Sequence, residues 1–185
     1  MGDSMSNAIL KGNASGTGSI TLEAANTNSD RTISLPDANG TAMVSGNMPA
    51  FSAYQAGAQN ISNNTLTKIT LDTEVFDTNN NFASGRFTPT VAGYYLITAA
   101  VTYAAAPANG SCQTKISKNG AGDTNNCLTA AVSGQLFGAS ASAVLYLNGS
   151  TDYVELYTAQ GTGSVVGIFA NSAFVYMTGS MVRSA

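Results

Sequence analysis

Hydrophobic and polar residues alternate with a period of two over much of this chain, which predicts β-strands rather than helices. Short runs rich in Val, Ile, Thr, Tyr and Phe are separated by clusters of Gly, Asn, Asp and Pro, and no window shows apolar residues at helical spacing. Strands of this length and spacing are typical of a β-sandwich or barrel. Within residues 49–185 we predict strands at Ala50–Gln55, Leu66–Leu71, Gly85–Phe87, Gly93–Tyr103, Ser111–Lys118, Asn125–Ala131, Ser140–Asn148, Tyr153–Ala159 and Ser172–Met181.

Alternation within the predicted strand Gly93–Tyr103 indicates which of its faces is buried. One set of side chains is larger and more apolar than the other, so we expect it to face the core. That set is Tyr95, Ile97, Ala99, Val101 and Tyr103, against Leu96, Thr98, Ala100 and Thr102. In Ser172–Met181 both alternating sets begin with apolar residues, which leaves two alternatives: a strand covered on both faces at a subunit interface, or a central sandwich strand.

Residues 1–48 differ in character, because the first aromatic residue of the chain is Phe51. We predict short strands at Ser19–Glu23, Arg31–Leu35 and Thr41–Val44, separated by turn sequences rich in Asn, Asp, Pro and Gly. A segment with so few large side chains buries little surface alone, so we expect it to be an arm that docks on a partner. The candidate contact residues of this arm are Ile20, Leu22, Arg31, Ile33 and Leu35.

Composition narrows the classes of partner. Charged residues make up 9% of the chain, against a usual share of about 25%, and the formal net charge is -3. The seven basic residues are scattered, whereas nucleic-acid binding needs a basic patch, so no nucleic-acid partner is expected. No apolar run approaches the roughly 18 residues of a transmembrane helix, and Met1–Leu10 do not resemble a signal peptide. We therefore expect no membrane partner, and assembly in the cytoplasm.

The chain has no histidine, which removes the commonest general acid or base and the commonest metal ligand. The acidic residues Asp152 and Glu155 have an odd spacing on or beside one strand, so they should point to opposite faces and not pair as glycosidase carboxylates. No Gly-Lys-Ser/Thr sequence marks a phosphate loop. We therefore predict a protein that is not an enzyme and needs no cofactor.

Two features leave alternatives open. Cys112 and Cys127 are equidistant from Asn119-Gly120, which favours a two-residue type I′ turn; across such a hairpin they would form either a disulfide or two buried thiols. A catalytic thiol is disfavoured because no base would activate it. The run 77–81 has oxygen ligands at alternate positions, like the start of a calcium loop, but lacks the central Gly and distal Glu. We therefore prefer a polar turn there.

Several landmarks then follow one another in order along residues 49–183. They are Pro49–Ala53, Val75–Asp77, Gly85–Pro89, Val91–Tyr95, Lys118–Gly120, Ala143–Leu147, Asp152–Leu156 and Ser172–Phe174. This order resembles the globular head of complement C1q and its relatives, which share a jelly roll with tumour-necrosis-factor ligands. The resemblance implies an all-β chain with a ten-stranded jelly-roll sandwich at 49–185 that packs as a homotrimer. Some such trimers bind calcium near the axis, but the resemblance assigns no calcium ligands here. The candidate trimer-interface residues are Tyr95, Tyr103, Phe174 and Tyr176.

The arm has its own resemblance. Gly16–Leu22 and Asn26–Thr41, with the string Arg-Thr-Ile-Ser-Leu-Pro-Asp-Ala-Asn-Gly-Thr, resemble a segment of bacteriophage virion proteins, especially those of cyanophages. This implies a structural protein located in the virion. We expect a trimeric capsid decoration, or cement, protein: residues 1–48 anchor to the major capsid protein or another virion protein, and residues 49–185 form a surface knob. The arm spans at most roughly 160 Å, which is short for a fibre shaft. The alternative is a short tail fibre or receptor-binding tip that contacts the host surface, with a host-surface glycan as its partner.

Overall fold

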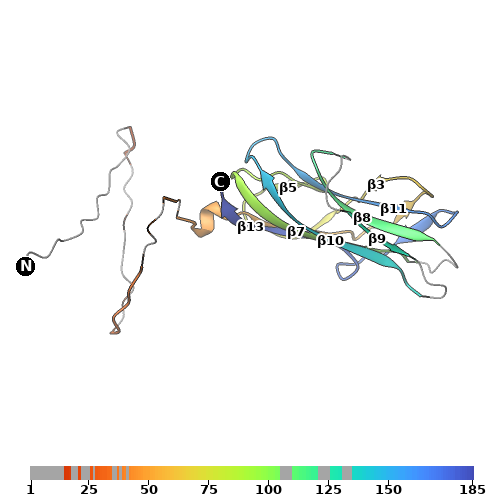
Figure 1. Cartoon of the computed structure of the whole chain (residues 1–185), viewed down its shortest axis with the longest axis horizontal. Helices are drawn as coiled ribbons and strands as arrows, with labels where there is room; N and C mark the ends of the chain where they lie inside the picture. Colours follow the sequence, from red (N-terminus) through yellow and green to blue (C-terminus); the bar gives the residue numbers. More distant parts are fainter. Residues whose placement is uncertain are drawn as a thin grey trace, which may run out of the picture. The chain divides into compact units, whose positions relative to one another are not determined.

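The computed structural model describes residues 15–17, 21, 26, 28–34, 37, 39–40, 42–104, 110–120, 126–130 and 135–185, with the backbone alone for 126–129. The chain divides into two units, Met1–Asn39 and Gly40–Ala185. Every strand that the structure assigns lies in the second unit (Figure 1). A 3-10 turn, η1 (Ser45–Asn47), precedes the first strand.

Two antiparallel sheets form the body of the second unit, which confirms the predicted all-β jelly-roll sandwich. The five-stranded sheet has the order β10 (Gly138–Leu147), β7 (Gly93–Thr102), β13 (Val175–Ser184), β1 (Ala50–Tyr54), β4 (Thr73–Asp77). The six-stranded sheet has the order β5 (Phe82–Ala83), β6 (Arg86–Phe87), β11 (Val154–Gln160), β8 (Ser111–Lys118), β9 (Asn126–Ala130), with β3 (Thr67–Lys68) beside β11. A separate pair joins β2 (Gln59–Ile61) and β12 (Val166–Ile168).

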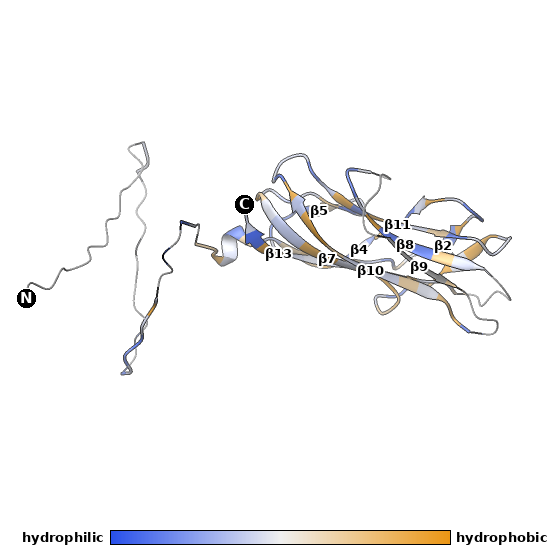
Figure 2. Cartoon of the chain, viewed as in Figure 1, coloured by the Kyte–Doolittle hydropathy of each residue, from blue (hydrophilic) through white to orange (hydrophobic). Residues whose placement is uncertain are grey.

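The hydrophobic core lies between the two sheets. Phe51 of β1 stacks on Phe87 of β6, with 4.2 Å between ring centroids, and Tyr95 of β7 meets Phe87 edge-on at 5.6 Å. Tyr95, Ile97, Ala99 and Val101 are all fully buried, which confirms the predicted inward face of β7. Full burial of each large apolar side chain contributes about 1.5–3 kcal/mol. Hydrophobic and hydrophilic residues are interspersed along the strands, as this alternation requires (Figure 2).

Strand β13 is a central strand of its sheet, between β7 and β1. Val175, Met177 and Met181 point into the core, while Tyr176 and Thr178 on the other face are half-buried. Gly179 takes an inward position opposite both Phe51 and Ile97. A Cβ there would lie 2.4 Å from Ile97 Cδ1 and 2.9 Å from Phe51 Cε1. Any larger residue would therefore force these two packed side chains to shift.

The predicted strands of the arm are not observed where the structure describes them. Residues 31–34 and 42–44 are not in strands, so the predictions at Arg31–Leu35 and Thr41–Val44 are wrong in the described positions. The prediction at Ser19–Glu23 falls outside the described residues apart from Thr21. A strand gains its hydrogen bonds from a neighbour, and within one chain these residues bury too little apolar surface to offset their ordering entropy.

The register of β8 and β9 differs from the one predicted for a two-residue hairpin. Asn119 and Gly120 have φ angles of 58° and 106°, as a type I′ turn requires. The register, however, pairs Cys112 with Thr129 and Thr114 with Cys127. The two cysteines are diagonal rather than opposite, and diagonal neighbours are about 7–8 Å apart. This exceeds the usual Cα separation of a disulfide, so the register disfavours that alternative.

Candidate functional site

The outward face of the five-stranded sheet is the candidate functional surface. Its strands alternate between core and surface, so each contributes every second residue to this face. One row across the sheet is Val144, Leu96, Ser180 and Ala50, and the next is Ser142, Thr98, Thr178, Ser52 and Phe76. Tyr146 and Tyr94 pair beside the first row, and their ring centroids are 5.5 Å apart. We call these residues the outer-sheet face.

The outer-sheet face has no charged side chain among the residues just defined. Arg183, beyond a bulge near the end of β13, lies at its border. Large apolar groups remain accessible within one chain: Val144 is 59% exposed, Phe76 48% and Leu96 39%. A shallow hollow of about 230 Å³ lies between Phe76 and Leu96, and its floor includes Gly179. Depletion of charge with enrichment of Tyr and Phe is the composition of a protein–protein interface core.

The three tyrosines and one phenylalanine predicted at a trimer interface do not lie on one surface. Tyr95 and Tyr103 are fully buried within the single chain. The Tyr95 hydroxyl donates to the Val91 carbonyl at 2.6 Å, and the Tyr103 hydroxyl lies 2.8 Å from Thr158 Oγ1. Burial raises the pKa of each of these two tyrosines to about 12. Side chains with no accessible surface cannot contact a second copy, so their assignment to an interface is corrected to the core.

The other two predicted interface residues do reach the surface. Tyr176 is half-buried on the outer-sheet side of β13, opposite Ala100 of β7. Phe174 is 36% exposed, and its ring stacks on Phe169 at 4.6 Å. The structure thus brings Tyr176 to the outer-sheet face. Alternation in β7 also indicated Leu96 as an outward residue, but the sequence analysis did not include it among the candidate interface residues.

Of the five arm residues predicted to contact a partner, two are described. Ile33 is 87% exposed and Arg31 is exposed. Ile20, Leu22 and Leu35 lie outside the described residues.

The opposite face of the sandwich is charged. Glu155 of β11 is almost fully buried there, and its Oε1 accepts from Lys68 Nζ at 2.7 Å and from Arg86 Nη2 at 2.9 Å. Tyr157 donates its hydroxyl to Glu155 Oε2 at 3.0 Å. Burial by itself would raise the pKa of Glu155, but the hydrogen bonds from Lys68, Arg86 and Tyr157 outweigh it and hold the pKa below its ordinary value.

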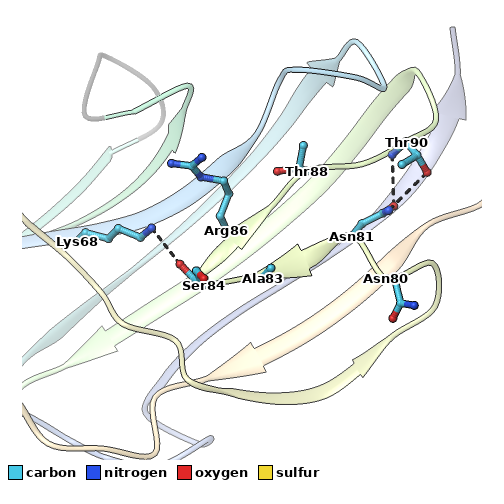
Figure 3. A pocket seen from close by; sticks show the side chains of 8 residues that line it. All are labelled: Lys68, Asn80, Asn81, Ala83, Ser84, Arg86, Thr88 and Thr90. Atoms are coloured by element: carbon cyan, nitrogen blue, oxygen red, sulfur yellow. Dashed lines mark hydrogen bonds between the residues drawn. The ribbon is translucent and has the colours of Figure 1, made fainter.

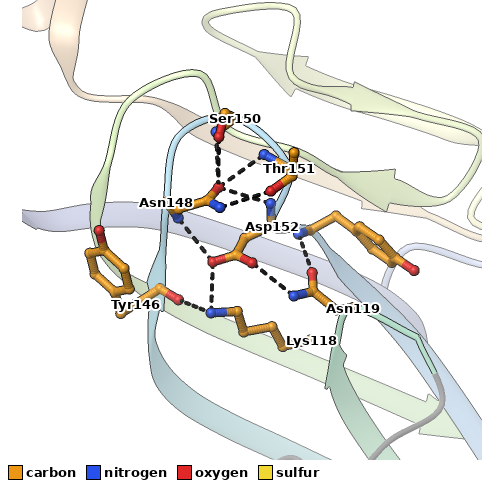
Figure 4. A network of polar contacts seen from close by, with 8 residues as sticks. Lys118, Asn119, Tyr146, Asn148, Ser150, Thr151 and Asp152 are labelled. Atoms are coloured by element: carbon orange, nitrogen blue, oxygen red, sulfur yellow. Dashed lines mark hydrogen bonds and ion pairs between the residues drawn. The ribbon is translucent and has the colours of Figure 1, made fainter.

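A second carboxylate organises the turn between β10 and β11 (Figure 4). Asp152 Oδ1 accepts from Asn119 Nδ2 at 2.8 Å, and Oδ2 accepts from Lys118 Nζ at 2.7 Å and from the Asn148 amide at 3.1 Å. The hydrogen bond from Asn119 and the contact with Lys118 lower the pKa of Asp152. Asn148 Oδ1 in turn accepts the amides of Ser150, Thr151 and Asp152. This network fixes a turn and leaves no open position for chemistry.

The run 77–81 is a polar turn, as preferred from the sequence. Asp77 Oδ2 accepts the Phe82 amide at 2.6 Å and Oδ1 accepts the Asn79 amide at 3.3 Å, so the carboxylate closes the β4–β5 connection. Asp72 likewise accepts the amides of Ala56 and Gly57, which lowers its pKa. In the described part of the chain, no group of three or more His, Cys, Asp or Glu side chains is arranged to hold a metal ion. Nor do the described residues include a helix long and apolar enough to cross a membrane.

Comparison with known proteins supports the fold and does not supply a family. No family model matches the chain, and no curated protein matches it by sequence. The structure of murine APRIL is similar, with a TM-score of 0.57 and 11% identity over 73% of this chain and 99% of that one. The Eiger TNF structure from S. frugiperda has a TM-score of 0.53 and 11% identity, over 75% of this chain and 93% of that one.

A bacteriophage protein is also similar in structure. The PRD1 vertex protein P5 has a TM-score of 0.49 and 16% identity, over 75% of this chain and 98% of that one. This score is too low to support an argument about function. The APRIL and Eiger comparisons therefore show that this chain shares their jelly-roll fold.

Proposed function

We propose that the chain is a homotrimeric structural protein of a bacteriophage virion, and that it decorates the capsid. Three copies of residues 49–185 pack through their outer-sheet faces into a knob. Residues 1–48 anchor the knob to the major capsid protein or a neighbouring virion protein. Binding only to the assembled lattice stabilises that lattice by mass action, which is how a cement protein acts.

The observation that carries the trimer is the contrast between the two outer surfaces of the sandwich. The outer-sheet face combines Leu96, Val144 and the Tyr94–Tyr146 pair with small residues, and its charged neighbours, Arg183 and Lys118, lie at its border beside the two tyrosines. The opposite surface contains Lys68, Arg86 and Glu155. On a free monomer, charged side chains on a broad sheet face remain hydrated and cost little free energy. On a face buried between copies, each unpaired charge would destabilise the assembly. The sequence resemblance to C1q-like heads independently implies three copies.

The virion role rests on the arm. Its string Arg31–Thr41 resembles phage virion proteins, and the exposed Ile33 is available for a partner. An arm that binds another protein gains at that contact the apolar burial that it lacks alone.

The trimer is tested by light scattering of the purified full chain, with a matched pair of variants. We expect a mass of three times the 18.8 kDa chain. Leu96→Arg places three like charges at the proposed interface and should give monomers with an unchanged far-UV CD spectrum. The control Val165→Arg changes an apolar residue in the β11–β12 loop that is 60% exposed, against 39% for Leu96, and should leave the trimer intact. A monomeric wild type, or a Leu96→Arg trimer, would contradict the proposed interface.

The location is tested on particles. Cryo-electron microscopy of the virion should show three-fold knobs on the capsid, and a chain lacking residues 1–48 should remain trimeric but no longer bind particles. If density for the protein were found only at the tail, the protein would be a short tail fibre or receptor-binding tip and not a capsid decoration. Retention of particle binding without the arm would refute the anchoring role.

A further inference from the structure

A polar hollow of about 520 Å³ lies beside the turn between β5 and β6. It is lined by Lys68, Asn80, Asn81, Ala83, Ser84, Arg86, Thr88 and Thr90 (Figure 3). Small-molecule sites generally have volumes of about 300–1,000 Å³ and mostly apolar walls. This hollow has the volume of such a site, and its lining combines apolar surface with ammonium, guanidinium, amide and hydroxyl groups. It is therefore suited to a ligand rich in hydrogen-bonding groups.

The hollow contains an unusual share of the positive charge of this chain. Residues 49–185 include five basic residues, Lys68, Arg86, Lys115, Lys118 and Arg183, of which Lys68 and Arg86 line the hollow. Glu155 Oε1 contacts both of these cations and balances one of their two charges. The cluster of Lys68, Arg86 and Glu155 thus has one positive charge in excess. A cation in a partly desolvated concavity attracts an anion more strongly than it would in open water.

The two cations are already held in place. Lys68 Nζ donates to Glu155 Oε1 and, at 3.1 Å, to the Ser84 carbonyl, which uses two of its three hydrogens. Arg86 directs Nε and Nη2 at Glu155, and its guanidinium lies 3.7 Å from the centroid of the Tyr153 ring. Arg86 Nη1 has no acceptor among the described residues. Donors that are fixed before binding and still unused lower the entropic cost of holding an anion.

The far end of the hollow presents neutral polar groups. Figure 3 shows Lys68 and Arg86 at one end, and Asn80, Asn81 and Thr90 at the other. Asn81 is buried, and its Nδ2 donates to the Asn79 carbonyl at 3.0 Å, which fixes the amide. Ser84, between the two ends, has a φ of 52°, a left-handed conformation that favours Asn or Gly in turns of this kind.

We propose that this hollow binds an acidic saccharide. Its carboxylate, sulfate or phosphate group lies at the Lys68–Arg86 end, and its ring hydroxyls contact the amide of Asn80 and the hydroxyl of Thr88, while Asn81 holds the Thr90 turn in place. Charge-assisted hydrogen bonds to the acidic group provide affinity, and the neutral end provides selectivity for a sugar over a simple anion. Nothing in this proposal depends on the virion role.

The hollow stays accessible in the proposed trimer. Val154 and Leu156, on either side of Glu155 in β11, are fully buried in the core. Glu155 and its two cations therefore project from the surface opposite to the outer-sheet face. A trimer that packs through the outer-sheet face leaves this surface free for a ligand.

The test measures binding of the full-length protein to a panel of acidic saccharides by calorimetry. The panel contains carboxylated, sulfated and phosphorylated oligosaccharides, each with a neutral counterpart of the same length, and inorganic sulfate as a separate arm. We expect at least one acidic saccharide to bind ten-fold or more tightly than its neutral counterpart and than sulfate. Arg86→Gln should weaken that binding ten-fold or more. The control Arg31→Gln removes the same charge from the arm and should have no effect.

A second variant keeps the test decisive if Arg86→Gln folds poorly. Thr88→Val is close in shape and leaves the ion pairs of Glu155 intact, and we expect it to weaken the acidic saccharide several-fold while binding of sulfate is unchanged. The inference is wrong if no acidic saccharide binds more tightly than its neutral counterpart, or if sulfate binds as tightly as the saccharide. Equal losses from Arg31→Gln and Arg86→Gln would also overturn it, since they would indicate unspecific attraction.

Discussion

Neutralising Glu155 should destabilise the sandwich, and the loss should depend on pH. Glu155→Gln keeps the volume of the side chain but removes a charge that is 3% exposed and shared by Lys68 and Arg86. Breaking a fully buried ion pair costs about 3–5 kcal/mol. Lys68 and Arg86 are 32% and 43% exposed, so water can solvate their charges once the carboxylate is gone. The glutamine oxygen also still accepts a hydrogen bond. We therefore expect a loss of about 2 kcal/mol in the free energy of unfolding at pH 7.

The direction of the pH dependence follows from the lowered pKa of Glu155 in the folded state. Its contribution is fully present above the unfolded pKa of about 4.3, and is lost as the pH falls through the folded value. The difference between wild type and Glu155→Gln should thus be largest near neutral pH and shrink in acid. Asp152 also has a lowered pKa, but it is present in both proteins and does not alter this difference.

Urea denaturation, followed by far-UV CD at one fixed protein concentration, measures this effect, because the stability of an oligomer depends on concentration. Glu74→Gln is the matched control, since Glu74 is exposed on the edge strand β4 and should change stability by less than about 0.5 kcal/mol. Equal stability of wild type and Glu155→Gln at pH 7 would refute the reasoning. A difference of the same size at pH 7 and pH 3 would refute the electrostatic cause.

Two further predictions concern the core. Gly179→Ala places a Cβ 2.4 Å from Ile97 Cδ1 and should destabilise the fold by about 1–3 kcal/mol in the same urea assay, whereas a neutral result would mean that the β13–β1 packing is looser than described. Tyr95 and Tyr103, with pKa values of about 12, should stay protonated at pH 11 in the native protein and ionise there once urea is added, as followed by ultraviolet absorbance. Their raised pKa values contribute stability below the unfolded value, and it is lost as the pH rises through about 12. Full ionisation of all eight tyrosines at pH 11 without unfolding would contradict this burial.

Local pattern was sufficient for much of the fold. Period-two alternation predicted the buried face of β7, and the runs between turn residues placed β8 at its observed bounds, Ser111–Lys118. The same reasoning failed for short strands such as β2 and β12, because three residues are too few to show a period. It also predicted strands in the arm, where the composition suits a strand but the described residues have no neighbouring strand to pair with.

The candidate sites needed the tertiary structure. Alternation placed Tyr95 and Tyr103 on the core side of β7, yet the resemblance to trimeric heads suggested both as interface residues, and only the structure shows that neither side chain is accessible. The hollow depends on Lys68 and Arg86 reaching Glu155 across 87 and 69 residues of sequence.

The sequence by itself therefore determined that this chain is an all-β sandwich without histidine chemistry, because alternation and composition are local properties that each segment shows alone. Only the tertiary structure decided which uncharged face is left exposed and which charges converge on one hollow. The reason is that strand register and sheet packing bring together residues far apart in sequence, and no single segment determines the free energy of those contacts.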